Sequence, residues 1–142
     1  MGWVVDTCLL IDVLEDDPEF GRSSAAMLED CVAQGLLICP VTYVELAPAF
    51  SGDVSLQEEF LAGVGVDWRQ DWIWQDSLRA HSAWHDFIRR KRAGALPKRP
   101  LADLLIGAFA ARHDGLLTRN DKDFSLLFPD LTVPRYRDGS PA

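Results

Sequence analysis

Four acidic residues follow short apolar runs or open expected helices: Asp6, Glu45, Asp103 and Asp121. Asp6 directly follows the run Trp3–Val5, and Asp121 comes shortly after the run Leu116–Thr118. In an open sheet of parallel strands, ligands bind outside the carboxyl ends of the strands. We therefore expect the four carboxylates to converge on one rim of such a sheet.

Carboxylates gathered at one rim would repel one another, and a fold tolerates several of them chiefly when a cation neutralises their charge. Oxygen atoms are the ligands that Mg²⁺ and Mn²⁺ prefer. One or two such ions orient a phosphodiester, lower the pKa of a bound water and stabilise the leaving oxygen. The four acids as a set favour a metal-dependent nuclease.

Each carboxylate also has a purely structural interpretation. Glu45 stands three residues after Thr42, which is the spacing of a capping box. Asp103 would complement the dipole of the helix that it opens, and Asp121 would be an ordinary turn residue. Asp6 is harder to explain in this way, because a carboxylate at the end of an apolar strand is costly unless it is paired. The functional interpretation depends on the set.

The elements expected to position these acids alternate between short apolar strands and amphipathic helices. We expect about five short strands, at residues 3–5, 36–39, 64–68, 116–118 and 131–133. We expect helices at residues 9–15, 23–34, 56–61, 74–93 and 101–113, another from the N-cap Thr42 towards Phe50, and a last one around residues 123–127. The pattern predicts one α/β domain over residues 1–142, with a polar tail from about residue 135.

The composition fits one soluble, cytoplasmic domain. The 142 residues are 48% hydrophobic, which is enough for a single core. Fourteen basic residues stand against 22 acidic ones, and the net charge of −8 argues against a nucleic-acid binder that uses its whole surface. The three cysteines form no CxxC pair and suit reduced core thiols. No apolar run approaches the ~18 residues of a membrane span, and the N-terminus does not resemble a signal peptide.

One segment departs from the acidic average. Residues 89–99 contain six basic residues and no acid: Arg89, Arg90, Lys91, Arg92, Lys98 and Arg99. Such a segment can hold a polyanion locally while the acidic body repels it elsewhere. The alternative is a solvated helix end, where basic residues complement the helix dipole.

Four segments of the chain together resemble a known family. They are Val4-Val5-Asp6-Thr7-Cys8-Leu9-Leu10-Ile11, Val41-Thr42-Tyr43-Val44-Glu45-Leu46, Leu101-Ala102-Asp103-Leu104-Leu105-Ile106-Gly107-Ala108 and Leu116-Leu117-Thr118-Arg119-Asn120-Asp121-Lys122-Asp123-Phe124. Their order and spacing resemble the signature segments of PIN-domain ribonucleases, and the length makes the chain most similar to VapC-type toxins of bacterial toxin–antitoxin pairs.

This resemblance implies a PIN-like three-layer fold, with a central parallel sheet flanked by helices. It also implies cleavage of RNA that depends on Mg²⁺ or Mn²⁺, a homodimer, and inhibition by a cognate VapB-type antitoxin. By motif position, Asp6 and Asp103 would be the principal metal ligands, and Glu45 would complete the site. Asp121 is the favoured fourth acid, with Asp123 as second choice and Asn120 in the same loop.

The resemblance leaves further positions to interpret. Thr7 or Thr118 would orient a carboxylate or a bound water by a hydrogen bond. The segment that includes Arg89, Arg90, Arg92, Lys98 and Arg99 would grip the RNA backbone beside the site.

Other features suggest weaker alternatives. His81 and His85 have the i, i+4 spacing of a shared zinc site but lack the glutamate of an HExxH motif, so metal binding there is the minority interpretation. Three nearby tryptophans, Trp68, Trp72 and Trp74, suit the core by default and a partner-binding groove as the alternative. The rival to an enzyme is therefore a catalytically inactive PIN-like module that binds a protein partner.

Overall fold

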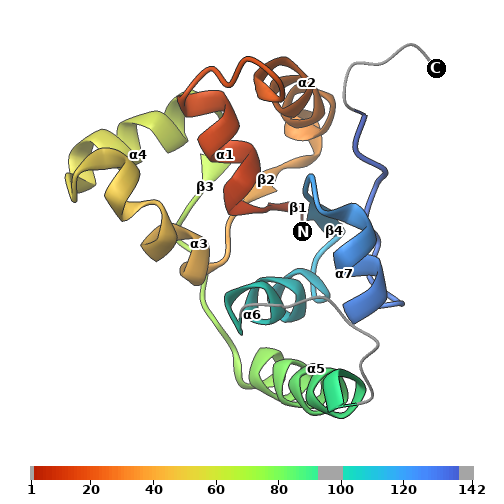
Figure 1. Cartoon of the computed structure of the whole chain (residues 1–142). Coiled ribbons are helices and arrows are strands. Elements are labelled where there is room, and N and C mark those ends of the chain that lie inside the picture. The colour runs from red at the N-terminus through yellow and green to blue at the C-terminus, as the bar shows by residue number, and fades with distance from the viewer. Residues whose placement is uncertain (1, 93–100, 138–142) are drawn as a thin grey trace.

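The computed structural model of the chain describes residues 2–92 and 101–137 (Figure 1). Its sheet has four parallel strands: β1 (Trp3–Val5), β2 (Leu36–Leu37), β3 (Val66–Asp67) and β4 (Gly115–Leu117). Their order is β3-β2-β1-β4, so that Val4 of the inner strand β1 pairs with Leu37 on one side and with Leu116 on the other. The uninterrupted apolar sequences of β1, β2 and β4 are typical of parallel sheets with both faces covered.

Seven α-helices surround the sheet in the part of the chain that the structure describes. They are α1 (Thr7–Leu14), α2 (Gly21–Cys31), α3 (Pro40–Glu45), α4 (Val54–Gly63), α5 (Trp74–Arg92), α6 (Leu101–Ala110) and α7 (Asp121–Leu127). Two short 3₁₀ helices, η1 (Val32–Gln34) and η2 (Ala47–Phe50), extend α2 and α3. Figure 1 shows α1, α2 and α4 on one side of the strands and α5 and α6 on the other. This is the predicted three-layer α/β architecture.

The two faces of the sheet carry separate apolar clusters. Successive side chains of a strand point to opposite faces. Val5 accordingly packs with Leu9 and Leu10 of α1 and with residues of α2, η2 and α4. Val4 packs on the other face with Ile106 and Phe109 of α6 and with residues of β4 and α7. The sheet is thus buried on both sides, and polar groups are left at the ends of its strands.

The prediction of a fifth strand at residues 131–133 is wrong. These residues form no strand, although the N–H of Leu116 donates one hydrogen bond to the carbonyl oxygen of Thr132, at 3.0 Å. Pro129 and Pro134 flank the segment, and proline cannot donate to a ladder. The contact is close because Gly115 has φ +152°, and a Cβ there would collide with the same carbonyl oxygen.

The prediction that Thr42 caps a helix is also wrong. Helix α3 begins two residues earlier, at Pro40, with Cys39 in the N-cap position. Proline is favoured in the first helical turn, because its fixed φ suits the helix and the N–H that it lacks would be unsatisfied there. Thr42 therefore lies inside the helix, where its side chain is buried.

Within residues 2–92 and 101–137, no helix is long and apolar enough to cross a lipid bilayer.

Candidate active site

Asp6 occupies the junction between β1 and α1. Its carboxylate is 4% exposed, and Oδ1 accepts a hydrogen bond from the N–H of Thr7 at 2.8 Å as the N-cap of α1. Oδ2 accepts the hydroxyl of Thr118 at 2.7 Å and lies 3.4 Å from Sγ of Cys8. The parallel register of β1 and β4 explains this meeting. Val5 pairs with Leu117, so the next residues of the two strands, Asp6 and Thr118, become neighbours.

Glu45 is joined to the same corner through Thr7. The Thr7 hydroxyl donates to Oε1 of Glu45 at 2.7 Å and lies 3.0 Å from the hydroxyl of the buried Thr42. Glu45 is the last residue of α3 and is exposed. Because α3 begins before Thr42, the capping-box interpretation of Glu45 does not hold. Adjacent residues at the start of α1 thus contact β4 on one side and α3 on the other.

Asp103 approaches from a different element. It lies in the first turn of α6 and is half-buried. Helix α6 packs against α3, whose last residue is Glu45, and Figure 1 shows the two helices side by side. Glu45 and Asp103 therefore lie on two helices in contact with each other, and Asp6 is joined to the first of these helices through Thr7.

The loop after β4 supplies the residues among which the fourth acid was sought. Asp121 accepts the N–H of Tyr136 at Oδ2, at 2.9 Å, so that its carboxylate binds the C-terminal segment. The N–H of Asn120 donates to Oγ1 of Thr118 at 3.0 Å. Asp123 is half-buried in the first turn of α7. Asp121 is therefore joined to residues 131–137 as well as to its own helix.

The carboxylates are the type of ligand that a hard cation prefers, but they do not form a complete coordination site. Among the residues that the structure describes, no group of three acid, histidine or cysteine side chains is close enough to hold an ion without rearrangement. Mg²⁺ keeps several waters and binds proteins through one or two carboxylates together with substrate phosphates. Both carboxylate oxygens of Asp6 accept hydrogen bonds, Oδ1 from the N–H of Thr7 and Oδ2 from Thr118 and Cys8, and these bonds hold the carboxylate in one orientation. Asp6 and Glu45, linked through Thr7, fit this kind of binding.

The thiol beside the carboxylate of Asp6 is held in its neutral form. Burial, and then the charge of Asp6, raise the pKa of Cys8 to about 12. Burial likewise raises the pKa of Cys39 to about 12. A neutral thiol is a poor nucleophile and a poor metal ligand. The candidate metal ligands around Asp6 are therefore oxygen atoms and not the cysteine thiols.

The basic segment is only partly described. Arg89 and Arg90 lie at the end of α5, where Arg89 is 3.6 Å from Asp86 and Arg90 donates to the carbonyl oxygen of Leu126 in α7 at 3.4 Å. Lys98 and Arg99, and the side chain of Arg92, lie outside the described residues. Arg90 therefore joins the end of α5 to α7.

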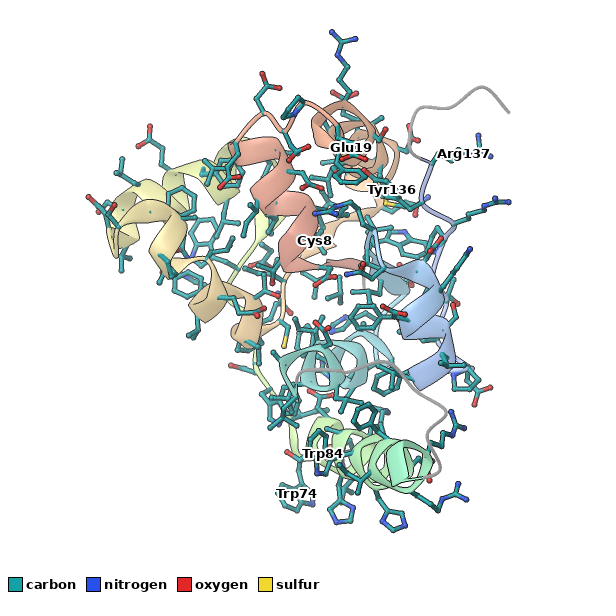
Figure 2. All side chains as sticks on the ribbon, viewed as in Figure 1. Cys8, Glu19, Trp74, Trp84, Tyr136 and Arg137 are labelled. Atoms are coloured by element: carbon teal, nitrogen blue, oxygen red, sulfur yellow. The ribbon has the colours of Figure 1, made fainter. Side chains whose placement is uncertain are left out.

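The candidate partner-binding and zinc residues lie on or beside α5. His81 and His85 are both exposed, and no third ligand stands beside them in the described part of the chain. Trp72 is half-buried, whereas Trp74 is 71% exposed and points outward from the start of α5 in Figure 2. Trp74 therefore lies outside the core.

Sequence reasoning missed the closest polar network to the site. The sequence favours a solvated loop for the acidic run Asp12, Glu15, Asp16, Asp17 and Glu19, with Asp12 the only member near enough to Asp6 to matter. In the structure Asp12 is 3% exposed in α1. Its carboxylate accepts both Nε of Arg119, at 2.7 Å, and Nη2, at 3.0 Å. Burial alone would lower the pKa of Arg119, but the hydrogen bonds and charge of Asp12 raise it. The only sequence signal was that Asp12 follows Asp6 by six residues on one helix.

The comparisons with known proteins agree with this architecture. A family model described as PIN domain matches residues 3–127. Among solved structures, the chain is similar to the crystal structure of VapBC2 from Rickettsia felis bound to a DNA fragment from their promoter. The similarity has a TM-score of 0.72 at 17% sequence identity and covers 96% of this chain and 100% of that chain. At this identity it shows the fold. No curated protein matches the chain.

Proposed function

Because the chain belongs to the PIN domain family, we propose that it is a metal-dependent endoribonuclease and the toxin of a VapC-type toxin–antitoxin pair. The observation that supports this most is the buried carboxylate of Asp6, which is oriented by Thr118 and linked through Thr7 to Glu45. A buried carboxylate at a strand end is costly unless the surroundings use its charge.

The proposed site comprises Asp6, Glu45 and Asp103, with Asp121 or Asp123 as the fourth acid. These carboxylates would hold Mg²⁺ or Mn²⁺. When bound, such an ion lowers the pKa of a water for attack on the phosphodiester and stabilises the leaving oxygen.

The chain's own residues orient the groups. Thr118 fixes one oxygen of Asp6, and the backbone N–H of Thr7 fixes the other. The Thr7 hydroxyl sets the direction of Glu45. Partners of this kind commonly control the affinity and activity of metal sites. Thr7 and Thr118 are therefore proposed to orient the acids rather than to react.

The proposed substrate is RNA, and its backbone would approach along the basic segment that includes Arg89 and Arg90. A cluster of carboxylates without an ion repels phosphate, so RNA binding at the centre would depend on the metal. The fold that the chain shares with VapBC2 supports a VapB-type antitoxin as partner. A homodimer and a cytoplasmic location complete the proposal.

The test is cleavage of total cellular RNA by purified, antitoxin-free protein with Mg²⁺ or Mn²⁺, compared with EDTA. We expect discrete fragments that disappear with EDTA and in the folded variants Asp6→Asn and Asp103→Asn. Asp130→Asn makes the same change at an exposed acid and should cleave as the unaltered protein does.

The opposite result would favour a different function. If the protein binds Mn²⁺ but cleaves no RNA from several sources, the chain is better explained as an inactive binding module. The exposed Trp74 and Leu78 on α5 would then be the first surface to examine for a protein partner.

A further inference from the structure

The loop after β4 is bound twice to α1. The hydroxyl of Thr118 donates to Asp6, the residue that caps α1. The guanidinium of Arg119 donates two hydrogen bonds to the carboxylate of Asp12, in the second turn of the same helix. The backbone N–H of Asn120 donates a hydrogen bond to the hydroxyl oxygen of Thr118. Because the two bonds to α1 come from adjacent loop residues, moving Arg119 would move the hydroxyl that orients Asp6.

A second layer of contacts holds the ion pair. The hydroxyl of Ser24, buried in α2, donates to Oδ2 of Asp12 at 2.7 Å and lies 2.9 Å from the hydroxyl of Tyr136. The guanidinium of Arg119 lies 4.1 Å from the centre of the Phe20 ring, which Tyr136 meets edge-on. Figure 2 shows Tyr136 beside α2, although it lies 112 residues from Ser24 in the sequence.

Tyr136 also reaches the other end of the loop. Its backbone N–H donates to Oδ2 of Asp121 at 2.9 Å, while its hydroxyl pairs with Ser24. The C-terminal segment therefore holds both the ion pair and a candidate fourth acid. Every residue from Thr118 to Asp121 takes part in a hydrogen bond of this network.

We propose that Asp12 and Arg119 are positioning residues of the carboxylate site, and that Ser24 and Tyr136 brace their ion pair. The pair holds the loop after β4 so that Thr118 orients Asp6. This inference rests on the proposed function for its consequence in catalysis, and on the hydrogen bonds alone for its effect on the loop.

The alternative is that the pair only stabilises the fold. Stability alone is a weak reason for a buried ion pair, because apolar residues of similar volume often serve as well or better. The molecule offers a matched control in Asp76 and Arg112, which form a second buried, forked pair at 2.8 and 3.0 Å. Arg112 follows the C-terminal end of α6, whereas Asp103 lies in the first turn of that helix.

The experiment compares Asp12→Asn with Asp76→Asn in the full chain. Three properties are measured in each: Mn²⁺ affinity by calorimetry, kcat and KM for a cleaved RNA, and amide hydrogen exchange in residues 117–121. We expect Asp12→Asn to lower Mn²⁺ affinity or kcat by about tenfold or more, with KM for RNA within about twofold. Exchange in the loop should become faster. Asp76→Asn should leave these properties within about twofold of the unaltered protein.

Equal effects of the two substitutions, or no effect of Asp12→Asn on any of the three properties, would overturn the proposal. If Asp12→Asn does not fold, Arg119→Lys replaces it, since lysine keeps the charge but cannot form the fork. If the unaltered protein cleaves no RNA, the proposed function fails by itself. Loop exchange in the two variants then still decides whether the pair positions the loop.

Discussion

In two parts of the molecule, a buried aspartate is paired with an arginine in the same geometry. Asp12 and Asp76 are both buried, and each accepts a forked pair of hydrogen bonds from an arginine that is about one quarter exposed. In each case the guanidinium also lies over a phenylalanine ring. The two pairs are therefore closely similar, although Asp76 also accepts Nη1 of Arg79 at 3.3 Å. They differ chiefly in their neighbours.

The neighbours give the two pairs different consequences. Arg119 is adjacent to Thr118, whose hydroxyl orients Asp6, whereas Arg112 donates to the carbonyl oxygen of Asp71 and joins the start of α5 to the end of α6. Asp76 also accepts the N–H of Ile73, at 3.0 Å. The pair at Asp76 therefore fastens helices, whereas the pair at Asp12 fastens a loop of the proposed site.

Removing either acid should cause the largest loss of stability. Asp76→Ala leaves the N–H of Ile73 without its acceptor and leaves the partly buried guanidinium of Arg112 with only the carbonyl oxygen of Asp71, and we expect a cost on the order of 3 kcal/mol. Asp12→Ala should cost a similar amount. Urea unfolding of both variants measures the two costs. A loss below about 1 kcal/mol for either would mean that water replaces the acid and that the pairs are not matched.

Much of the site could be predicted from the sequence because it follows from local rules. An acid directly after an apolar strand lies at the sheet edge in any parallel arrangement, and this predicted the place of Asp6. The pairing of β1 with β4 then brings Thr118 to it. The position of Glu45 on a helix after the second strand could be predicted from an approximate helix alone.

The network around Asp12 could not be predicted in this way. Its sequence neighbours, among them Glu15 and Asp16, are exposed and made the whole run seem solvated. Its partner Arg119 lies 107 residues away, and Tyr136 lies 112 residues from Ser24, which it contacts, so no periodicity connects them. The wrong prediction of a strand at residues 131–133 also concerns a tertiary contact. Between two prolines, these residues make one hydrogen bond to β4, which does not form a strand.

A smaller change in stability should distinguish the region of Asp76 and Arg112 from that of Asp12 and Arg119, because only the first is expected to lose stability as the pH falls. Burial lowers the pKa of His113, which is next to Arg112, and the nearby charge of Arg112 lowers it further. Its Nε2 is buried and has no hydrogen-bond partner within residues 2–92 and 101–137. The unfolded chain therefore binds the proton more readily. The stability contributed by neutral His113 is present above about pH 6.5 and is lost as the pH falls through its folded pKa.

His113→Phe should remove this dependence, because phenylalanine fills the same space beside Phe109 without titrating. Unfolding at several values between about pH 5 and 8 measures the effect. The other histidines, His81 and His85, are exposed and provide a matched control in His81→Phe, which should leave the slope unchanged. An unchanged slope in His113→Phe would show that the region of Asp76 is no more sensitive to pH than the region of Asp12.

The smallest effect tests the brace of the first pair. Tyr136→Phe removes the hydroxyl that meets Ser24 but keeps the ring against Phe20 and the backbone N–H that binds Asp121. We expect a loss of about 1 kcal/mol in stability. Asp12 keeps Ser24 and Arg119, so the ion pair should persist with a modest rise in hydrogen exchange at residues 118–121.

Tyr43→Phe is the matched control for this last change, because Tyr43 donates its hydroxyl to Oε2 of Glu58 at 2.7 Å. It should cost similar stability without altering exchange in the loop after β4. If Tyr136→Phe and Tyr43→Phe leave that loop equally unchanged, the tyrosine hydroxyl does not brace the ion pair. The ion pair of Arg119 and Asp12 would then persist without the tyrosine hydroxyl, and that pair would hold the loop together with the bond of Thr118 to Asp6 and the bond of the Tyr136 N–H to Asp121.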